Sequence, residues 1–449
     1  MRIEPARRIR GRLRLPGDKS ISHRAAIISA LARGQSRLTN FSTSEDCAAT
    51  LRCLRELGVA IERDGMSVLV EGTGSQGGEG GGCSLRAPSV ALDCGNSGST
   101  MRMLAGVLAG QDFDSELTGD ASLRSRPMGR IIEPLEMMGA RVASDRGRAP
   151  LRLSGRNPLK PIRYEMPVAS AQVKSCILLA GLNAKGRTVV IEKQGSTRDH
   201  TERMLRWFGV PVETFSEEHD GAWPDVVAVD SPDPFAARDV DIPGDISSAA
   251  FFIAAAALLH GSQLEISDVG LNPTRAQILR LLQSLGARVQ IREMRERSGE
   301  TVGDVQISAG VGLSPTKPGE SNVLRGALVP QLIDELPLLA VVGTQVEGGV
   351  TIRDAAELRV KESDRISATV WNLRAMGAEV EEYADGLAVA GTTRLRGAVL
   401  DARGDHRIGM AFTVAALIAD GASEIKGAQE CVRVSFPEFY HLLADISER

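Results

Sequence analysis

Hydrophobic and polar positions along the chain follow one pattern that occurs six times. Each copy consists of an apolar residue, a polar or glycine-rich turn, and then a helix of small and apolar residues. The copies begin at Leu15, Leu92, Met166, Ile242, Val329 and Leu400. They are about 75 residues apart, which is longer than most solenoid repeats. A β-patterned run such as SRLTNF or RTVVIEK follows each helix and predicts a strand. The pattern therefore predicts six units of helices and strands.

The units contain two kinds of predicted helix. Each of the first five units continues into a second helix that closes on glycine, whereas the last offers only a final helix in SFPEFYHLLADI. In CAATLRCLRELG the residues Leu51, Leu54 and Leu57 share one face, so this helix is amphipathic and covers the outside. The first helices, such as 249–259, are apolar nearly all round and are predicted to be buried.

Polar residues in the buried helices are confined to the first turn, so the helix starts must face something polar. Three units per domain would give two domains, each with three buried helices ending at a common surface. A helix N-terminus carries unpaired N–H groups and about half a positive charge. Several such ends together favour an anionic ligand, and we expect an anionic small molecule in a cleft between two domains.

Composition narrows the class of protein. The 449 residues are 43% hydrophobic and 24% charged, with a formal net charge of −4, so neither a nucleic-acid-coating protein nor a polybasic membrane protein is expected. The longest apolar run, 249–259, is well short of the roughly 20 residues that span a bilayer. Six cysteines without a CxxC pair argue against a disulfide framework or a zinc site. No secretory signal is recognisable, so a cytoplasmic location is expected.

The first turns and the loops between them form a cation-rich set with a few carboxylates. Arginine binds phosphate and carboxylate groups bidentately, lysine serves as a compact charge or proton donor, and Ser, Asn and Gln orient neutral oxygens. The set comprises Lys19, Ser20, Arg24, Asn96, Arg102, Arg124, Arg126, Ser170, Gln172, Lys174, Arg198, Asp245, Asp334, Glu335, Lys361, Glu362, Arg365, Asp405 and Arg407.

Across the whole chain, the motifs LPGDKSISHR, LDCGNSGSTMR, GDASLRSRPMGR, ASAQVKS, STRDHTE, IDELP, ELRVKESDR and DHRIGMAF resemble the 5-enolpyruvylshikimate-3-phosphate synthase family, closer to its second class. The resemblance implies an α/β (α+β) fold of the inside-out α/β barrel type, in which two domains of three βαβαββ-like repeats flank a cleft. It also implies that residues 1–17 and 241–449 form one discontinuous domain and that residues 18–240 form an inserted one.

The resemblance further implies the reaction: the enolpyruvyl group of phosphoenolpyruvate moves to the 5-hydroxyl of shikimate 3-phosphate, and phosphate leaves. By resemblance, the residues around shikimate 3-phosphate are Lys19, Ser20, Arg24, Ser170, Ala171, Gln172, Arg198, Asp334 and Lys361. Those around phosphoenolpyruvate are Lys19, Asn96, Gly98, Arg126, Gln172, Glu362, Arg365 and Arg407.

The reaction requires an acid and a base, because the hydroxyl loses a proton while the enol methylene gains one. Asp334 is the candidate base at the hydroxyl. Glu362 is the candidate acid at the methylene carbon, and Lys19 is a second candidate for that proton. For His23 and His406 we expect structural roles. No metal or organic cofactor is implied, and a monomer is the family expectation.

Two positions depart from the family pattern, and three alternatives stay open. Val434 stands where many relatives carry a lysine that helps to hold phosphoenolpyruvate. Gly98 is predicted to leave room for the bulkier inhibitor glyphosate. A UDP-N-acetylglucosamine enolpyruvyl transferase would need a loop cysteine that 119–130 lacks. An RNA-end phosphate cyclase would need a nucleotide site and a nucleophilic histidine. The non-enzyme alternative is a catalytically inactive, anion-binding homologue.

Overall fold

The structure is a computed structural model that describes residues 1–74, 85–193, 195–218, 222–310, 312–319 and 322–449. The chain divides into two compact units. The first unit comprises Met1–Leu15, Pro243–Arg295 and Thr301–Arg449, and the second comprises Pro16–Ile242 together with Glu296–Glu300. These units are defined by their compactness. The domain boundaries expected at residues 17 and 241 therefore stay a prediction.

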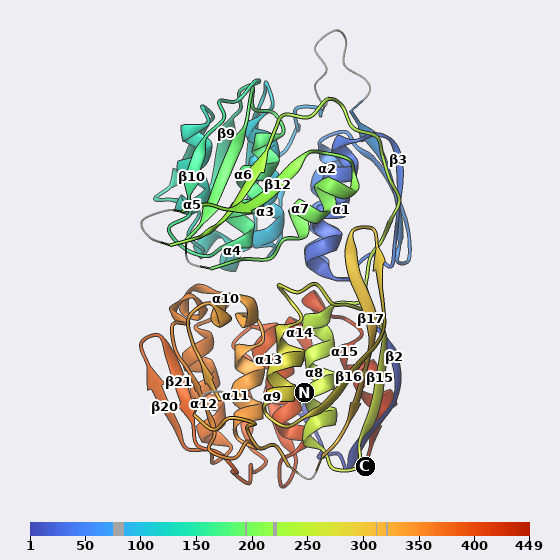
Figure 1. Cartoon of the computed structure of the whole chain (residues 1–449), viewed down its shortest axis with the longest axis vertical. Coiled ribbons are helices and arrows are strands. Elements are labelled where there is room, and N and C mark those ends of the chain that lie inside the picture. Colours follow the sequence, from blue (N-terminus) through green and yellow to red (C-terminus); the bar gives the residue numbers. More distant parts are fainter. Residues whose placement is uncertain (75–84, 194, 219–221, 311, 320–321) are drawn as a thin grey trace. The chain divides into compact units, whose positions relative to one another are not determined.

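The six predicted first helices are present, and nearly every residue in them is buried. In the second unit they are α1 (Lys19–Leu31), α3 (Gly98–Ala109) and α6 (Ala171–Gly181). In the first unit they are α8 (Ile246–Leu258), α11 (Leu336–Gly343) and α13 (His406–Leu417). Figure 1 shows α1, α3 and α6 between β9 (Arg148–Ser154) and β10 (Arg163–Glu165) on one side and β3 (Arg33–Thr39) on the other. It likewise shows α8, α11 and α13 between β20 (Val380–Tyr383) and β21 (Gly386–Val389) on one side and β15 (Gln263–Gly270) on the other. The interior of each unit is therefore helical.

The second helices lie outside these cores and stop at glycine, as predicted. They are α2 (Glu45–Glu56), α5 (Gly129–Met137), α7 (His200–Trp207), α9 (Gln277–Ser284) and α12 (Arg365–Ala375). The glycine after each has positive φ, from 81° at Gly209 to 100° at Gly139, a conformation that a Cβ atom disfavours. In α2 the leucines Leu51 and Leu54 are buried and Arg52 is exposed, so its amphipathic face is confirmed.

The sheets repeat one topology. In the second unit β6 (Leu92–Asp93) runs parallel to β7 (Asp114–Thr118), which pairs antiparallel with β9 (Arg148–Ser154), and β9 pairs with β8 (Arg141–Asp145). The same order recurs in β10 (Arg163–Glu165), β11 (Thr188–Glu192), β13 (Asp225–Val229) and β12 (Val212–Ser216), and in β14 (Val240–Asp241), β3 (Arg33–Thr39), β5 (Ser67–Thr73) and β4 (Ala60–Asp64).

The described residues of the first unit also form three sheets. The largest contains β16 (Arg288–Arg297), β17 (Glu300–Ser308), β15 (Gln263–Gly270), β2 (Arg8–Arg14) and β24 (Ser447–Glu448). The others contain β18 (Val323–Leu324), β19 (Val350–Ile352), β21 (Gly386–Val389) and β20 (Val380–Tyr383), and β1 (Arg2–Ile3), β23 (Ser423–Lys426) and β22 (Val399–Asp401). The predicted fold class is confirmed. Among the described residues, no helix is both long enough and apolar enough to cross a membrane.

Two details differ from the predicted repeat. The last unit is completed by the start of the chain, because β1 pairs antiparallel with β23. The fifth unit has a short helix α10 (Leu328–Leu332), a turn at 333–335, and then α11. Pro337 near the start of α11 has no N–H to continue the helical ladder, which favours this break. Asp334 therefore lies in a turn between two helices.

The remaining short elements are α4 (Ala121–Ser125), the 3₁₀ helix η1 (Ala356–Val360), α14 (Ala428–Ser435) and α15 (Phe439–Ile446). The predicted final helix corresponds to α15. Val434 lies on α14 and is exposed.

Candidate active site

The start of α1 carries the first predicted cation. Asp18 caps the helix by accepting a hydrogen bond from the backbone N–H of Ile21 at 3.0 Å. Lys19 follows, and its Nζ lies 3.1 Å from Oδ2 of Asp46. Asp46 belongs to the first turn of α2, where acidic residues are common, so its pairing with Lys19 left no distinctive signal in the sequence. The pair holds Lys19 in place while both side chains stay partly exposed.

Arg24, one turn further along α1, is buried and shared among three helices. Its Nε donates to Oγ1 of Thr201 at 2.6 Å, its Nη2 to Oγ of Ser175 at 2.7 Å, and its Nη1 to the backbone oxygen of Ser20 at 2.8 Å. Burial lowers the pKa of Arg24 to about 10, against the attraction of Glu202, so the guanidinium is still charged at neutral pH. Arg24 thus ties α1 to α6 and α7.

The start of α3 holds a second cation. Nη2 of Arg126 donates to Oδ1 of Asn96 at 2.6 Å and to Oγ of Ser122 at 3.3 Å. Asn96 in turn donates to Asp120 at 2.7 Å, which fixes the orientation of its amide. Ser97 caps α3 by accepting from the N–H of Thr100. The neutral oxygens of Asn96 and Ser122 therefore orient Nη2 of Arg126.

Gln172 connects the starts of α3 and α6. Its Nε2 donates to Oγ of Ser99 at 2.9 Å, and its Oε1 accepts from Nη1 of Arg102. A Cβ atom at Gly98 would lie 2.6 Å from that same Nη1, so the missing side chain lets Arg102 pass over the helix start. Ser170, the N-cap of α6, accepts from the N–H of Val173, and Ala171 follows it as the first helical residue.

Below the start of α6 lies a buried ion triad. Nζ of Lys174 is 2.8 Å from Oε2 of Glu192 and 2.7 Å from Oε1 of Glu202, and none of the three side chains is more than 3% exposed. Burial opposes the charge on Lys174, but Glu202 and Glu192 outweigh it and raise the pKa of the ammonium. Glu192 also accepts from the N–H of Thr197, next to Arg198. The triad therefore anchors the loop that carries Arg198.

In the first unit, Arg365 gathers three carboxylates. It is the first residue of α12 and its side chain is 2% exposed. Its Nε lies 2.8 Å from Oδ2 of Asp405, its Nη2 2.7 Å from Oε2 of Glu362, and its Nη1 3.4 Å from Oδ1 of Asp334. Burial disfavours the charge, but the three carboxylates together raise the pKa of Arg365 well above its ordinary value. Both predicted acid–base residues thus contact one guanidinium.

A second buried group surrounds Glu335, the N-cap of α11. Its Oε1 lies 3.7 Å from Nη1 of Arg407 and 3.9 Å from Nη1 of Arg275, and it accepts a hydrogen bond from Ser247. Arg275 also lies 4.0 Å from Oδ2 of Asp334. Arg275 lies outside the recurring helix starts, so the repeat pattern did not reveal it. The group links Asp334 to Arg407 through buried charges.

Lys361 lies at the end of the 3₁₀ helix η1. Its Nζ is 3.9 Å from Oε1 of Glu357. Partial burial lowers the pKa of Lys361, and Asp334 and Glu357 oppose that shift. Among the described residues, no group of three or more His, Cys, Asp or Glu side chains could hold a metal ion.

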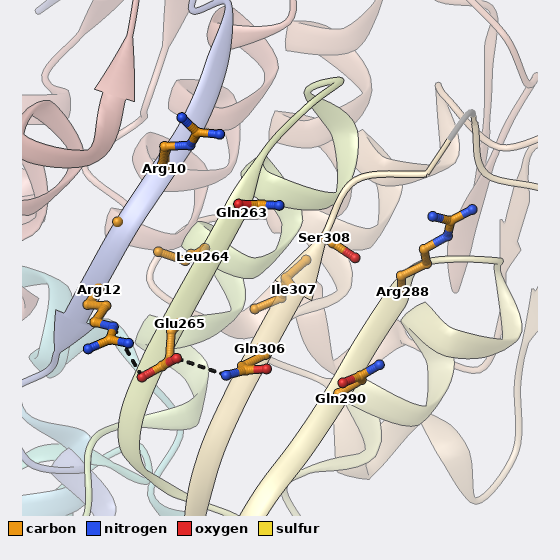
Figure 2. Close-up of a pocket in the computed structure, with 11 residues that line it drawn as sticks. Arg10, Arg12, Gln263, Leu264, Glu265, Arg288, Gln290, Gln306, Ile307 and Ser308 are labelled. Carbon is orange, nitrogen blue, oxygen red and sulfur yellow. Dashed lines mark hydrogen bonds and ion pairs between the residues drawn. The ribbon is translucent and has the colours of Figure 1, made fainter.

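A groove with a cavity volume of about 450 Å³ lies elsewhere, on the face of the five-stranded sheet (Figure 2). None of the predicted site residues lines it. Its central side chains bond to one another, because Glu265 lies 3.5 Å from Arg12 and accepts from Gln306 at 2.8 Å. The groove is the polar surface of a sheet, and it carries no acid–base constellation.

The fold is one that enolpyruvyl transferases of known structure share. The structure of the enolpyruvyl transferase NikO from Streptomyces tendae has a TM-score of 0.75 over 99% of this chain and 96% of that one. At 19% identity this likeness concerns the fold alone. A 2.37 Å structure of EPSP synthase from Acinetobacter baumannii has a TM-score of 0.83 and 38% identity, covering 99% of this chain and 98% of that one.

Sequence comparison names the family within that class. The family model described as EPSP synthase (3-phosphoshikimate 1-carboxyvinyltransferase) matches residues 3–443. Proteins named 3-phosphoshikimate 1-carboxyvinyltransferase from Koribacter versatilis and Solibacter usitatus are 49% and 47% identical, over 100% of this chain and 99% of each relative. The chain belongs to the EPSP synthase family, and the resemblance predicted from its motifs is confirmed.

Proposed function

We propose that this chain transfers the enolpyruvyl group of phosphoenolpyruvate to the 5-hydroxyl of shikimate 3-phosphate and releases phosphate, a step of the shikimate pathway to aromatic amino acids. The full-length family match supports this function. The observation that carries the mechanism is Arg365, whose guanidinium contacts both Asp334 and Glu362. An acid and a base held by one buried cation keep a defined separation.

In the proposed chemistry, Asp334 accepts the proton of the 5-hydroxyl as its oxygen bonds to C2 of phosphoenolpyruvate. Glu362 gives a proton to the C3 methylene, which becomes a methyl group in a tetrahedral intermediate. The bond from C2 to the phosphate oxygen then breaks, and the leaving phosphate takes up the proton that Asp334 accepted from the hydroxyl. C3 returns one proton to Glu362, so the carbon–carbon double bond reforms. Positioned acids and bases of this kind contribute roughly 10²–10⁴-fold each. Lys19 stays the second candidate for the C3 proton.

Both substrates are phosphorylated carboxylates, and the second unit offers cations that neutral groups hold. We assign Lys19, Asn96, Gly98, Arg126 and Gln172 to phosphoenolpyruvate. The residues assigned to shikimate 3-phosphate there are Lys19, Ser20, Arg24, Ser170, Ala171, Gln172 and Arg198. Three nitrogens of Arg24 are bonded to Thr201, Ser175 and Ser20, so its main contribution is to hold these helix starts together.

From the first unit we assign Asp334 and Lys361 to shikimate 3-phosphate, and Glu362, Arg365 and Arg407 to phosphoenolpyruvate. The proposal needs no metal or organic cofactor. A monomeric state and a cytoplasmic location stay predictions.

The test is phosphate release from phosphoenolpyruvate with shikimate 3-phosphate as acceptor, beside UDP-N-acetylglucosamine and a control without acceptor. The proposal predicts release with shikimate 3-phosphate alone. Release with the nucleotide sugar would identify the sibling transferase. Release with neither acceptor would contradict catalysis and favour an anion-binding protein.

A further inference from the structure

The hairpin between β16 and β17 ends in a tight two-residue turn. Ser298 and Gly299 have φ of 47° and 79°, the pair of positive values that a short hairpin turn requires. The tip, Glu296–Glu300, belongs to the second unit. It packs closely on α7, since a Cβ atom at Gly299 would lie 3.2 Å from the backbone oxygen of Arg203. Nη1 of Arg203 donates to the Gly299 oxygen at 3.4 Å.

One side chain of this tip enters the interior of the second unit. Oε1 of Glu300 lies 2.7 Å from Nδ1 of His200, the first residue of α7, and both side chains are 2% exposed. A buried carboxylate is costly unless a polar partner compensates for lost water. The contact with the imidazole supplies that partner and orients the ring. The hairpin tip thereby contacts the first residue of α7.

The start of α7 is also where the predicted shikimate-side cations are held. Thr201, next to His200, accepts from Arg24 at 2.6 Å and shares a 2.7 Å hydrogen bond with Ser175. Arg198 lies two residues before His200 in the loop that enters the helix. A shift of the first turn of α7 would therefore move the partner of Arg24 and the backbone of Arg198 together.

We propose that Glu300 is a positioning residue for the shikimate 3-phosphate half of the site, and that it acts through His200 on Arg24 and Arg198. The inference rests on the proposed function. Neither Glu300 nor its hairpin belongs to the recurring helix starts, and Glu300 stands 100 positions from His200 along the chain. Its contribution is to keep the first turn of α7 in register with α1 and α6.

The experiment compares Glu300→Ala and Glu300→Gln with Glu296→Ala and Glu296→Gln, which change an exposed carboxylate at the same tip. Steady-state constants for both substrates and a melting temperature are measured for each variant. We expect Glu300→Ala to raise KM for shikimate 3-phosphate about tenfold, while KM for phosphoenolpyruvate and kcat stay within about twofold. Glu300→Gln keeps an oxygen acceptor for Nδ1 and should restore most of the binding.

A merely structural role would lower the melting temperature and kcat, through a smaller active fraction, and leave KM for shikimate 3-phosphate unchanged. That result would overturn the proposal, as would equal losses for Glu300→Gln and Glu300→Ala. If Glu300→Ala does not fold, Glu300→Asp decides, because its shorter side chain keeps the charge and should raise the same KM. A soluble Asp variant with the parent KM would then contradict the proposal. A parent protein inactive with shikimate 3-phosphate would instead refute the proposed function itself.

Discussion

In the second unit, hydroxyl, amide and backbone oxygens accept hydrogen bonds from Arg24 and Arg126, whereas in the first unit carboxylates surround Arg365 and Arg407. Arg24 and Arg126 donate to the neutral oxygens of Thr201, Ser175 and Asn96. Lys19 and Lys174 of the second unit pair with carboxylates instead, Lys19 with Asp46 and Lys174 with Glu192 and Glu202.

The first unit has the opposite arrangement. Arg365 contacts three carboxylates, those of Asp405, Glu362 and Asp334. Arg407 and Arg275 both lie near the carboxylate of Glu335. Carboxylates neutralise these cations and can also accept or donate protons. Under the proposed function, these two arrangements serve two purposes: Arg126 in the second unit binds an anion, and Asp334 and Glu362 in the first unit transfer protons.

The largest effect is expected at the proposed base. Asp334→Asn removes the proton acceptor but keeps the shape, so kcat should fall roughly 10²–10⁴-fold. KM for phosphoenolpyruvate should change little, because Asp334 is not assigned to that substrate. The matched control is Asp420→Asn, an exposed carboxylate of the same unit that pairs with Arg394. Steady-state phosphate release measures both variants, and a parent-like kcat for Asp334→Asn would remove the distinction between the units.

Next in size is the buried triad of the second unit. Lys174→Met leaves Glu192 and Glu202 buried without their ammonium partner, and loss of one partner of a buried pair costs about 3–5 kcal/mol. Urea denaturation should show this drop in the free energy of unfolding. Lys185→Met, an exposed lysine at the end of the same helix region, should leave it unchanged. Equal stability of both variants would mean that the triad does not anchor the Arg198 loop.

A smaller effect is expected for substrate binding. Arg126→Ala removes a charge-assisted hydrogen bond of about 1.5–3 kcal/mol, so KM for phosphoenolpyruvate should rise at least about tenfold. Arg124→Ala, in the same segment but exposed, serves as the control and should bind normally. Normal saturation by phosphoenolpyruvate in Arg126→Ala would refute the assignment of Arg126.

His23 makes a pH-dependent contribution to stability. Burial lowers its pKa to about 3, so the ring is neutral in the folded protein, hydrogen-bonded to Thr50 at 2.7 Å. Between its ordinary pKa near 6.5 and about 3, the unfolded chain binds a proton that the folded chain does not, so stability falls as pH falls. The slope is at most about 1.4 kcal/mol per pH unit.

His23→Asn should flatten this dependence between pH 7 and pH 5, because Asn can keep the hydrogen bond to Thr50 without titrating. Denaturation by urea at the two pH values measures the slope, and His260→Asn, an exposed histidine, is the control. An unchanged slope in His23→Asn would show that other groups set the acid sensitivity.

The smallest change concerns Gly98. A Cβ atom there would press on Nη1 of Arg102, the flexible end of a long side chain that can move away. Gly98→Ala should therefore raise KM for phosphoenolpyruvate less than Arg126→Ala does, and it should weaken inhibition by the bulkier glyphosate more strongly. An inhibition constant that rises no more than KM would contradict the predicted role of Gly98.

Much of the fold could be predicted because helix burial and glycine stops are local signals. The positive φ of Gly58 or Gly377 follows from a helix that must end there. The pairing of β1 with β23 could not be predicted, since it joins residues more than 400 positions apart and rests on a two-residue strand. The break before α11 could have been inferred from Pro337. The apolar residues on both sides of the break instead read as one continuous helix.

The predicted site residues came from helix starts and motifs, and their groupings in the structure follow the repeat. The sequence did not single out Asp46, Arg275 and Glu300. An acidic first turn, a loop arginine and a hairpin glutamate are common features of protein surfaces. Only the tertiary contacts with Lys19, Asp334 and His200 distinguish them. Which substrate each residue binds stays a prediction, because that role depends on ligands and not on the fold.

The most direct test of the two purposes is kcat at saturating concentrations of both substrates for Arg126→Ala and Glu362→Gln, with Glu379→Gln as an exposed control. If the second unit binds and the first transfers protons, Arg126→Ala recovers to within about threefold of the parent kcat. Glu362→Gln stays roughly 10²-fold or more below it. The reverse order, or equal recovery of both variants, would contradict the division of labour between the two units.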